Sequence, residues 1–359
     1  MNTELKRIFI TLTILLITGY VVMKGAGIAL FAISAKDSGS TETVVVEITR
    51  GQNINEIAQS LSSRSVISDT TKFVRLGRLA RKLNKIKAGE YKLSASMSPL
   101  QIYRIITSGV SIGHLFTVRE GQNMYEIADN LQNKGFTTSA RFLSLCKSPN
   151  FMTSIGFPNP PPPSLEGYLF PDTYSLNKQT AIEEIVKRMV KRFQNVWTEE
   201  HQRLSEQMGM TQHEVITLAS VIEKETGVPY ERPVISSVFH NRLKKRMRLQ
   251  SDPTTIYGIW EKFQGNIHKE DLHKPTPYNT YTISGLPIGP IANPGKEAIE
   301  AALHPASSDY LFFVSHNDGT HEFTRSFREH SMAVKKFQLD RKAREGKSWR
   351  DYRKQQQQH

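Results

Sequence analysis

The stretch "TQHEVITLASVIEKETG", residues 211–227, is typical of a core helix that ends in a charged turn. Thr211 and Glu214 form the T-x-x-E pattern of a capping box, and an apolar run follows at once. At about 100° per residue, the apolar side chains of 215–222 point one way, and Glu223 and Glu225 lie about 80° to either side. Both carboxylates therefore flank the apolar face, and helical geometry does not choose between them. A half-buried carboxyl group can keep its proton at neutral pH, whereas the alternative is two solvated carboxylates on the rim of an ordinary helix.

Length and composition indicate a globular protein with an anionic partner. The chain has 359 residues, a length that is enough for two or three domains. Of these residues, 38% are hydrophobic and 23% are charged, as is ordinary for a globular protein. Its net charge of +13 favours nucleic acid, an acidic membrane surface or an acidic polymer as the partner. The single cysteine, Cys146, excludes an internal disulfide and a multi-cysteine metal site, and we interpret it as a core residue.

The N-terminus predicts a single transmembrane helix over residues 8–33. "IFITLTILLITGYVVM" (8–23) and "GAGIALFAI" (25–33) are interrupted only by Lys24, which can extend its amine to the membrane surface. A cleaved signal peptide is the alternative, but the apolar stretch is long for one. Lys6 and Arg7 place residues 1–7 in the cytoplasm, so we expect an inner-membrane protein whose bulk is periplasmic or extracytoplasmic. This location argues against a nucleic-acid partner.

An internal repeat follows a polar linker at residues 34–43. "VEITRGQNINEIAQSL" (46–61) matches "LFTVREGQNMYEIADNL" (115–131) at an offset of 70 residues. Each copy predicts a short strand, a glycine turn and an amphipathic helix, and "AGEYKLSASMSPLQIYRII" (88–106) predicts another strand and helix. The repeat resembles the LysM type of glycan-binding module, so we expect a duplicated LysM-like βα module over 44–156. The alternative is a duplicated packing unit without a ligand.

The rest of the chain predicts a mixed α+β domain over residues 157–340. The four prolines at 160–163 indicate a stiff spacer, and 181–197 has helical apolar spacing. A further helix is expected from about Arg232, and a hairpin around Asp318 and Gly319. Asn293 and Pro294 are expected to cap a helix that follows the long loop 278–295. A basic helical tail, 341–359, ends the chain.

The side chains available for chemistry point to carbohydrate rather than to a metal or cofactor. No H-E-x-x-H, G-x-S-x-G, P-loop or G-x-G-x-x-G pattern occurs in the sequence, and His316 and His321 are more simply strand residues beside a turn. Sugars are bound by carboxylates, amides and aromatic faces, and glycosidic bonds are cleaved with a carboxylic acid of raised pKa. Such groups in this region, besides the two helix glutamates, are Glu166, Gln250, Asp252, Tyr257, Tyr278, Asn279, Thr280 and Tyr281.

Four ordered blocks give the sequence a family resemblance. "EGYLFPDTY" (166–174), "ASVIEKET" (219–226), "SSVFHNRLKKRMRLQSDPTTIYG" (236–258) and "YNTYTISGLPIGPIANPG" (278–295) resemble the membrane-anchored endolytic murein transglycosylases. The resemblance implies that the essential glutamate lies in the E-K-E block, and it favours Glu223 over Glu225. Ile288 stands where the family usually has proline, a change that removes no reactive group. The eight residues given above are the candidates for the wall of the substrate cleft.

The reaction that the resemblance implies is non-hydrolytic cleavage of the β-1,4 bond between N-acetylmuramic acid and N-acetylglucosamine. Glu223 would act first as general acid and then as general base, which leaves a 1,6-anhydro end. A hydrolase would need a second carboxylate, and Glu166 and Asp252 keep that alternative open. The resemblance also implies work on new strands beside the peptidoglycan synthases. The rival hypotheses are a membrane-tethered glycan-binding protein without catalysis and a scaffold protein.

Overall fold

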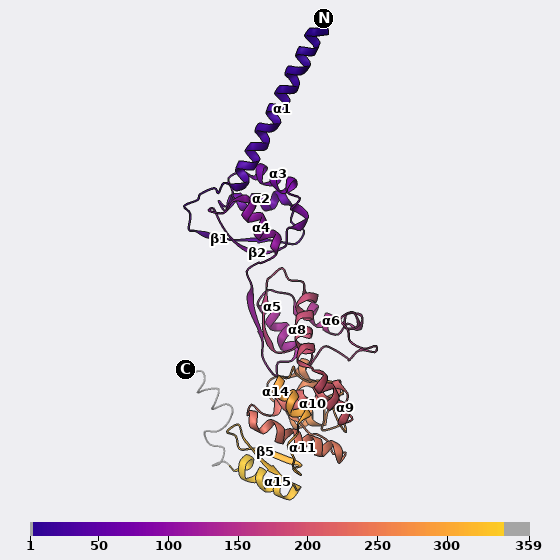
Figure 1. Cartoon of the computed structure of the whole chain (residues 1–359). Coiled ribbons are helices and arrows are strands. Elements are labelled where there is room, and N and C mark those ends of the chain that lie inside the picture. Colours follow the sequence, from indigo (N-terminus) through magenta and orange to yellow (C-terminus); the bar gives the residue numbers. More distant parts are fainter. Residues whose placement is uncertain (1–2, 341–359) are drawn as a thin grey trace. The chain divides into compact units, whose positions relative to one another are not determined.

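The computed structural model describes residues 3–340 as a mixed α+β protein with two compact units (Figure 1). Of the described residues, 3–115 and 175–180 form the first unit, and 116–174 and 181–340 form the second. The predicted α+β class is confirmed in this sense. The basic tail predicted over 341–359 lies outside the described residues.

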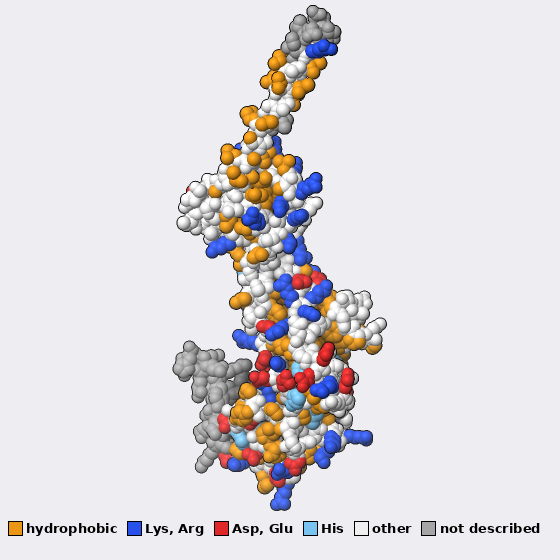
Figure 2. All heavy atoms as spheres, in the orientation of Figure 1, with side chains coloured by type: hydrophobic (Ala, Val, Ile, Leu, Met, Phe, Trp, Pro, Cys, Tyr) orange, Lys and Arg blue, Asp and Glu red, His pale blue; other side chains and the backbone are white. Residues whose placement is uncertain are grey.

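Helix α1 (Thr3–Ile33) is apolar along most of its length and largely exposed. Phe9 and Leu16 are 72% and 74% exposed, and the apolar side chains run along the helix in Figure 2. Within the described part of the chain, 9–33 is one helix that is long and apolar enough to cross a membrane, which is compatible with a single-pass anchor. Its last turn differs, since Phe31 and Ala32 are buried in the core of the first unit.

The remainder of the first unit builds a small core on an antiparallel strand pair. Strands β1 and β2 pair so that Val46 lies opposite Tyr91, and both side chains are fully buried. Helix α4 follows a capping box formed by Ser98 and Gln101, with Pro99 at its start. The elements are β1 (Thr43–Ile48), α2 (Ile54–Ser63), α3 (Thr70–Leu79), a 3₁₀ turn (Leu83–Lys85), β2 (Gly89–Ser94) and α4 (Pro99–Ser108).

The two copies of the repeat fold alike. Asn53 caps α2 and Asn123 caps α5, each in a capping box with the glutamate three residues later. Gly51 and Gly121 have φ of 80° and 73°, a left-handed conformation that explains the glycine in each turn. The second copy consists of β3 (His114–Val118), α5 (Met124–Asn133), α6 (Ser139–Cys146) and β4 (Asp172–Leu176), with β3 beside β4. The strand, turn and helix predicted for each copy are confirmed.

The second copy belongs mainly to the second unit, whereas the sequence placed both copies in one module that ends at 156. The chain after the four prolines shows the reason. Leu165, Tyr168 and Leu169 are at most 2% exposed, so this stretch packs into the second unit. The chain therefore enters the core of the second unit directly after the prolines, and the domain boundary expected at 156 and 157 stays a prediction.

The second unit is mainly helical and is centred on α10. All eight residues from Val215 to Ile222 are buried, and α10 packs against α9, α11, α12 and α14. The elements are α7 (Pro149–Ser154), α8 (Ile182–Val196), α9 (Glu199–Gln207), α10 (Gln212–Glu225), a 3₁₀ turn (Pro229–Glu231), α11 (Arg232–Lys244), α12 (Asp252–Gly258), a 3₁₀ turn (Trp260–Lys262), α13 (Lys269–His273), α14 (Lys296–Leu303), β5 (Phe312–Ser315), β6 (His321–Thr324), α15 (Phe327–Val334) and a π turn (Lys335–Leu339).

Most of the local predictions for this unit are confirmed. Thr211 and Glu214 form the expected capping box, α11 begins at Arg232, and β5 and β6 form the expected hairpin. The predicted cap of α14 was wrong. Gly295 is the N-cap residue, because the Asn293 side chain is held elsewhere: it accepts a bond from the Leu169 amide and donates to Glu166.

Candidate active site

The last turn of α10 carries its two glutamates into different surroundings. Glu223 and Glu225 lie on opposite flanks of the apolar face, as the helical spacing predicts. Glu225 meets the segment before α12, and Glu223 meets the first residue of α11 and the segment before α14. All of these elements belong to the second unit. The two carboxylates therefore differ in their partners although only Lys224 separates them.

Glu225 has the properties of a proton donor. The Ser251 hydroxyl donates a hydrogen bond to Glu225 Oε1, and the residue keeps some solvent exposure. Burial raises the pKa of the Glu225 carboxyl to about 7, against a smaller lowering by the Ser251 bond. The charge of Asp252 raises this pKa further, and that of Arg242 lowers it. At neutral pH a substantial fraction of Glu225 is therefore protonated.

The backbone beside Glu225 is held by a network between two segments. The Ser251 amide donates to Thr280 Oγ1, and the hydroxyls of Thr254 and Thr280 lie 2.8 Å apart. Tyr281 donates to Asp252 Oδ1 at 2.6 Å. Gln250 has φ of 49°, a left-handed conformation that is uncommon for a residue with a side chain. This strain occurs directly before Ser251, as is frequent at functional sites.

Glu223 lies in an ionic cluster. Its side chain is 7% exposed, Arg232 donates to its Oε1 at 3.3 Å, and the Gly295 amide donates to its Oε2 at 3.0 Å. Arg232 also pairs with Glu297. A Cβ on Gly295 would lie 2.0 Å from Glu120 Oε1, so the glycine makes room for this further carboxyl. Burial, and then the charge of Glu223, raise the pKa of Glu120.

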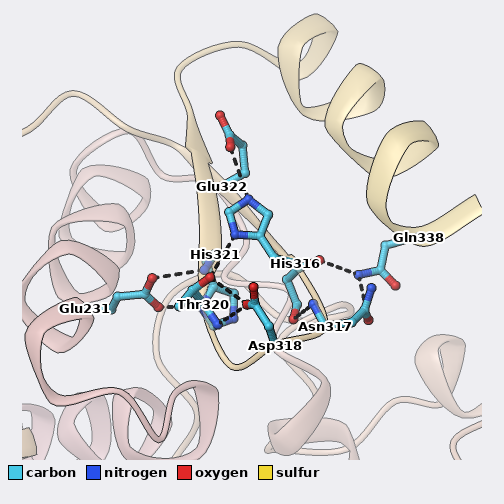
Figure 3. A network of polar contacts seen from close by, with 9 residues as sticks. Glu231, His316, Asn317, Asp318, Thr320, His321, Glu322 and Gln338 are labelled. Atoms are coloured by element: carbon cyan, nitrogen blue, oxygen red, sulfur yellow. Dashed lines mark hydrogen bonds and ion pairs between the residues drawn. The ribbon is translucent and has the colours of Figure 1, made fainter. Parts of the chain in front are cut away.

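A second network anchors the turn that precedes Arg232. Figure 3 shows Glu231 directed at His321 on the β5–β6 hairpin. The His321 amide donates to Glu231 Oε1 at 3.0 Å, and its Nδ1 lies 2.7 Å from Oε2. His316 bonds Thr320 and Glu322 on the same hairpin. The hairpin therefore holds the start of α11, and with it the guanidinium that pairs with Glu223.

Glu166 is a buried carboxyl with every bond made to protein. It is 1% exposed and accepts bonds from the Met124 amide, the Tyr257 hydroxyl and Asn293 Nδ2 at 2.8–3.1 Å. Burial raises the pKa of the Glu166 carboxyl to about 8, although the Met124 and Tyr257 bonds lower it. Glu166 thus joins the second repeat copy, α12 and the loop before α14.

The other candidate residues divide by exposure. Asn279 and Thr280 are fully buried, and Asn279 Nδ2 donates to the carbonyls of Asp271, Leu272 and Lys274. These two residues hold the loop, and a direct contact with substrate stays a prediction for both. Those that reach the surface at least partly are Gln250, Asp252, Tyr278 and Tyr281, while Tyr257 is 7% exposed.

Ser251, Arg232 and Arg242 were not among the predicted site residues. Ser251 lies between two candidates, Gln250 and Asp252, so its position carried a signal. The two arginines come from α11 and approach the end of α10 only through tertiary packing. No local sequence pattern predicts such a contact. Among residues 3–340, no group of three or more histidine, cysteine, aspartate or glutamate side chains could hold a metal ion.

The chain is similar to known proteins over most of its length. Residues 46–336 match the YceG-like family. An endolytic murein transglycosylase of Bacillus subtilis is 34% identical over 84% of this chain and 86% of its own length. One from Streptococcus pneumoniae strain D39 is 29% identical over 78% of this chain and 55% of its own length. The crystal structure of a putative YceG-like protein from Listeria monocytogenes covers 82% of this chain and 99% of its own, with 32% identity and a TM-score of 0.57. This chain belongs to the YceG-like family.

Proposed function

We propose that this protein is an endolytic murein transglycosylase that cuts the glycan strands of peptidoglycan and uses Glu225 as its proton carrier. Two relatives bear this name, and the family match covers most of the chain. The observation that carries the proposal is the Glu225 carboxyl, which is mostly buried, accepts the Ser251 hydroxyl bond and has a pKa raised by burial to about 7. A general acid of this pKa is suited to work at neutral pH.

The first step breaks the bond between C1 of N-acetylmuramic acid and the oxygen that links it to N-acetylglucosamine. Protonated Glu225 gives its proton to that oxygen, and the electron pair of the bond leaves with it as a new hydroxyl group. The positive charge that develops at C1 faces a carboxylate, since Glu225 is now ionised. The Ser251 hydroxyl bond stabilises that charged form.

The second step restores the acid. The Glu225 carboxylate takes the proton of the C6 hydroxyl of the same muramic sugar, and O6 bonds to C1. The product has a 1,6-anhydro end, no water is consumed, and Glu225 is protonated again. One carboxyl group is sufficient because an internal hydroxyl, held by the ring itself, replaces water as the nucleophile.

The choice of Glu225 differs from the sequence prediction of Glu223, which remains untested. The Arg232 guanidinium and the Gly295 amide occupy both oxygens of the Glu223 carboxyl. A group held in this way is suited to positioning the start of α11 and the segment before α14. Glu225 has the burial and the Ser251 bond that a proton carrier needs.

Hydrolysis is the alternative reaction at the same site. Asp252 is exposed and adjacent to Ser251, so it could direct a water molecule as a second carboxylate. Its bond from Tyr281 occupies Oδ1 and leaves Oδ2 for such a role. The products separate the two reactions, because an anhydro end is one water lighter than a hydrolysed end.

The test is mass analysis of the fragments that the purified full chain releases from isolated peptidoglycan. We expect anhydro ends on the internal fragments. Hydrolysed ends would assign the second mechanism, and intact strands would leave only a tethered binder.

The remaining parts of the chain fit this work at a membrane. Helix α1 is proposed as a single-pass anchor with residues 1–7 in the cytoplasm and the two units outside. The repeat copies are proposed as LysM-like glycan-binding elements, and the peptidoglycan synthases as neighbours that supply new strands. Protease protection of the two units in sealed inner-membrane vesicles tests the topology.

A further inference from the structure

A cavity of about 450 Å³ opens in the second unit beside the C-terminal end of α12. Four aromatic side chains line it: Tyr125, Tyr257, Trp260 and Tyr278. The rings of Tyr125 and Trp260 are nearly parallel, with centroids 6.0 Å apart, and Tyr257 meets Tyr278 edge to face at 4.7 Å. Aromatic faces of this kind pack against the C–H face of a pyranose ring.

The rim of the cavity is basic. Lys147, Lys262 and Lys274 line it and are exposed, and Glu261 is the one acidic side chain among its described lining residues. Lys147 Nζ lies 5.3 Å from the centroid of the Tyr125 ring and 3.5 Å from its hydroxyl. A ligand with a ring for the aromatic wall and a carboxylate for the lysines would match both features.

The cavity lies one short helix away from Glu225. Glu225 accepts its bond from Ser251, the residue before α12, whereas Tyr257 and Gly258 at the other end of α12 line the cavity. A helix of this length spans roughly 10 Å. The loop beside α12 runs between the same two places, since Tyr281 bonds Asp252 at the start of the helix and Tyr278 packs on Tyr257 at its end.

We propose that this cavity is a subsite for a muramic residue of the glycan strand, with its acidic stem peptide held by the lysines. The proposal deepens the proposed function and rests on it. A strand that lies along α12 would place one sugar bridge at Glu225 while a sugar beyond it binds the aromatic wall. Binding energy from such a remote sugar can be used to orient the bond that is cut.

The subsite also gives a role to Glu166, a buried carboxyl that the reaction does not use. Its bonds hold the Tyr257 hydroxyl and the Met124 amide, and both of these residues line the cavity. Glu166 is therefore a positioning residue for the aromatic wall. Its third bond, from Asn293, connects the wall to the segment whose Gly295 amide contacts Glu223.

Calorimetric titration of the full chain in detergent tests the subsite, with Glu225→Gln in every protein so that ligands are not cut. The two probes are a soluble muropeptide tetrasaccharide and chitotetraose, which has no acidic group. We expect Trp260→Ala to weaken both probes by about tenfold, or about 1.4 kcal/mol. Trp260→Phe keeps a ring and should restore most of the affinity.

The lysines give a second and independent readout. Lys147→Gln combined with Lys262→Gln should weaken the muropeptide several-fold, leave chitotetraose unchanged, and lose its effect in 1 M salt. Both side chains are exposed, so this variant should fold normally. Matched controls are Lys244→Gln on α11 and Phe327→Ala on α15, which should bind both probes like the parent.

The proposal is overturned if Trp260→Ala binds both probes as tightly as the parent, or if the lysine pair does not distinguish them. If the proposed function is wrong, the experimental results differ from these. The Glu225-intact chain would then release no anhydro fragments, while the binding differences among these variants would persist. The two outcomes are therefore separable in one set of proteins.

Discussion

The two sides of the last turn of α10 show how one helix end can give adjacent carboxylates different chemistry. On one side Glu223 meets a buried arginine and a backbone amide, which occupy both of its carboxyl oxygens. On the other side Glu225 meets a serine hydroxyl in a setting where burial raises its pKa to about 7. The difference comes from neighbouring segments rather than from the helix, so position within a motif does not by itself identify the proton carrier.

Apart from direct replacement of either glutamate, the largest expected effect is on the pH dependence of cleavage. If protonated Glu225 is the active form, kcat/KM should fall well above its pKa of about 7 by about tenfold per pH unit, which gives roughly 50-fold between pH 7 and pH 9. The measurement is the initial rate of anhydro-end formation by the full chain across pH 5 to 9. A flat profile through pH 8 would remove Glu225 as the acid.

The second effect concerns the ion pair between Glu223 and Arg232. Arg232→Met leaves Glu223 buried without its cation, so we expect a loss of about 3–5 kcal/mol in unfolding free energy. Glu297→Gln is the matched control: Glu297 also pairs with Arg232 but is 66% exposed, so its loss should stay below about 1 kcal/mol. Denaturant unfolding followed by circular dichroism compares them, and equal losses would contradict a special role for the Glu223 pair.

The third effect concerns Glu166, whose pKa rises from 4.5 to about 8 on folding. The folded state then binds the proton more tightly than the unfolded state, so stability is greatest below pH 4.5 and declines as the pH rises toward 8. The decline approaches about 1.4 kcal/mol per pH unit. Glu166→Gln should reduce the slope of the stability profile between pH 5 and 8, while the raised pKa of Glu225 keeps part of that slope up to about pH 7. A variant with the full parental slope would argue against this account.

The smallest expected effect tests how the neighbours of Glu225 set its pKa. The charge of Asp252 helps to raise the pKa of Glu225, so Asp252→Asn should move the alkaline limb of the rate profile to lower pH by a fraction of a unit. Cleavage itself should continue with anhydro products, because Asp252 is not the proton carrier in this account. Loss of all cleavage would instead favour the hydrolytic alternative, in which Asp252 directs the water.

Features with local signals were predictable from the sequence. The α10 cap, the two repeat copies and the β5–β6 hairpin each follow from residues a few positions apart. Asn293 shows the limit of such local prediction. Its position before a helix is typical of an N-cap residue, but its side chain bonds Leu169 and Glu166, more than 120 positions away.

The same limit applies to the choice between the two glutamates. Helical spacing placed both at the margin of the core, yet Ser251 and Arg232 reach them only through tertiary packing. The family resemblance favoured Glu223 without any knowledge of these partners. The physical environment of a carboxyl group, which sets its pKa, is a property of the folded unit and not of the motif.

The most direct measurement compares Glu225→Gln and Glu223→Gln in the full chain at pH 6 and scores anhydro ends by mass. Both changes are nearly isosteric, and both variants must first show parental circular dichroism. The account predicts that Glu225→Gln loses about 10²–10⁴-fold in rate, while folded Glu223→Gln keeps measurable cleavage with anhydro products. Normal anhydro-end formation by Glu225→Gln, with none from a folded Glu223→Gln, would contradict it.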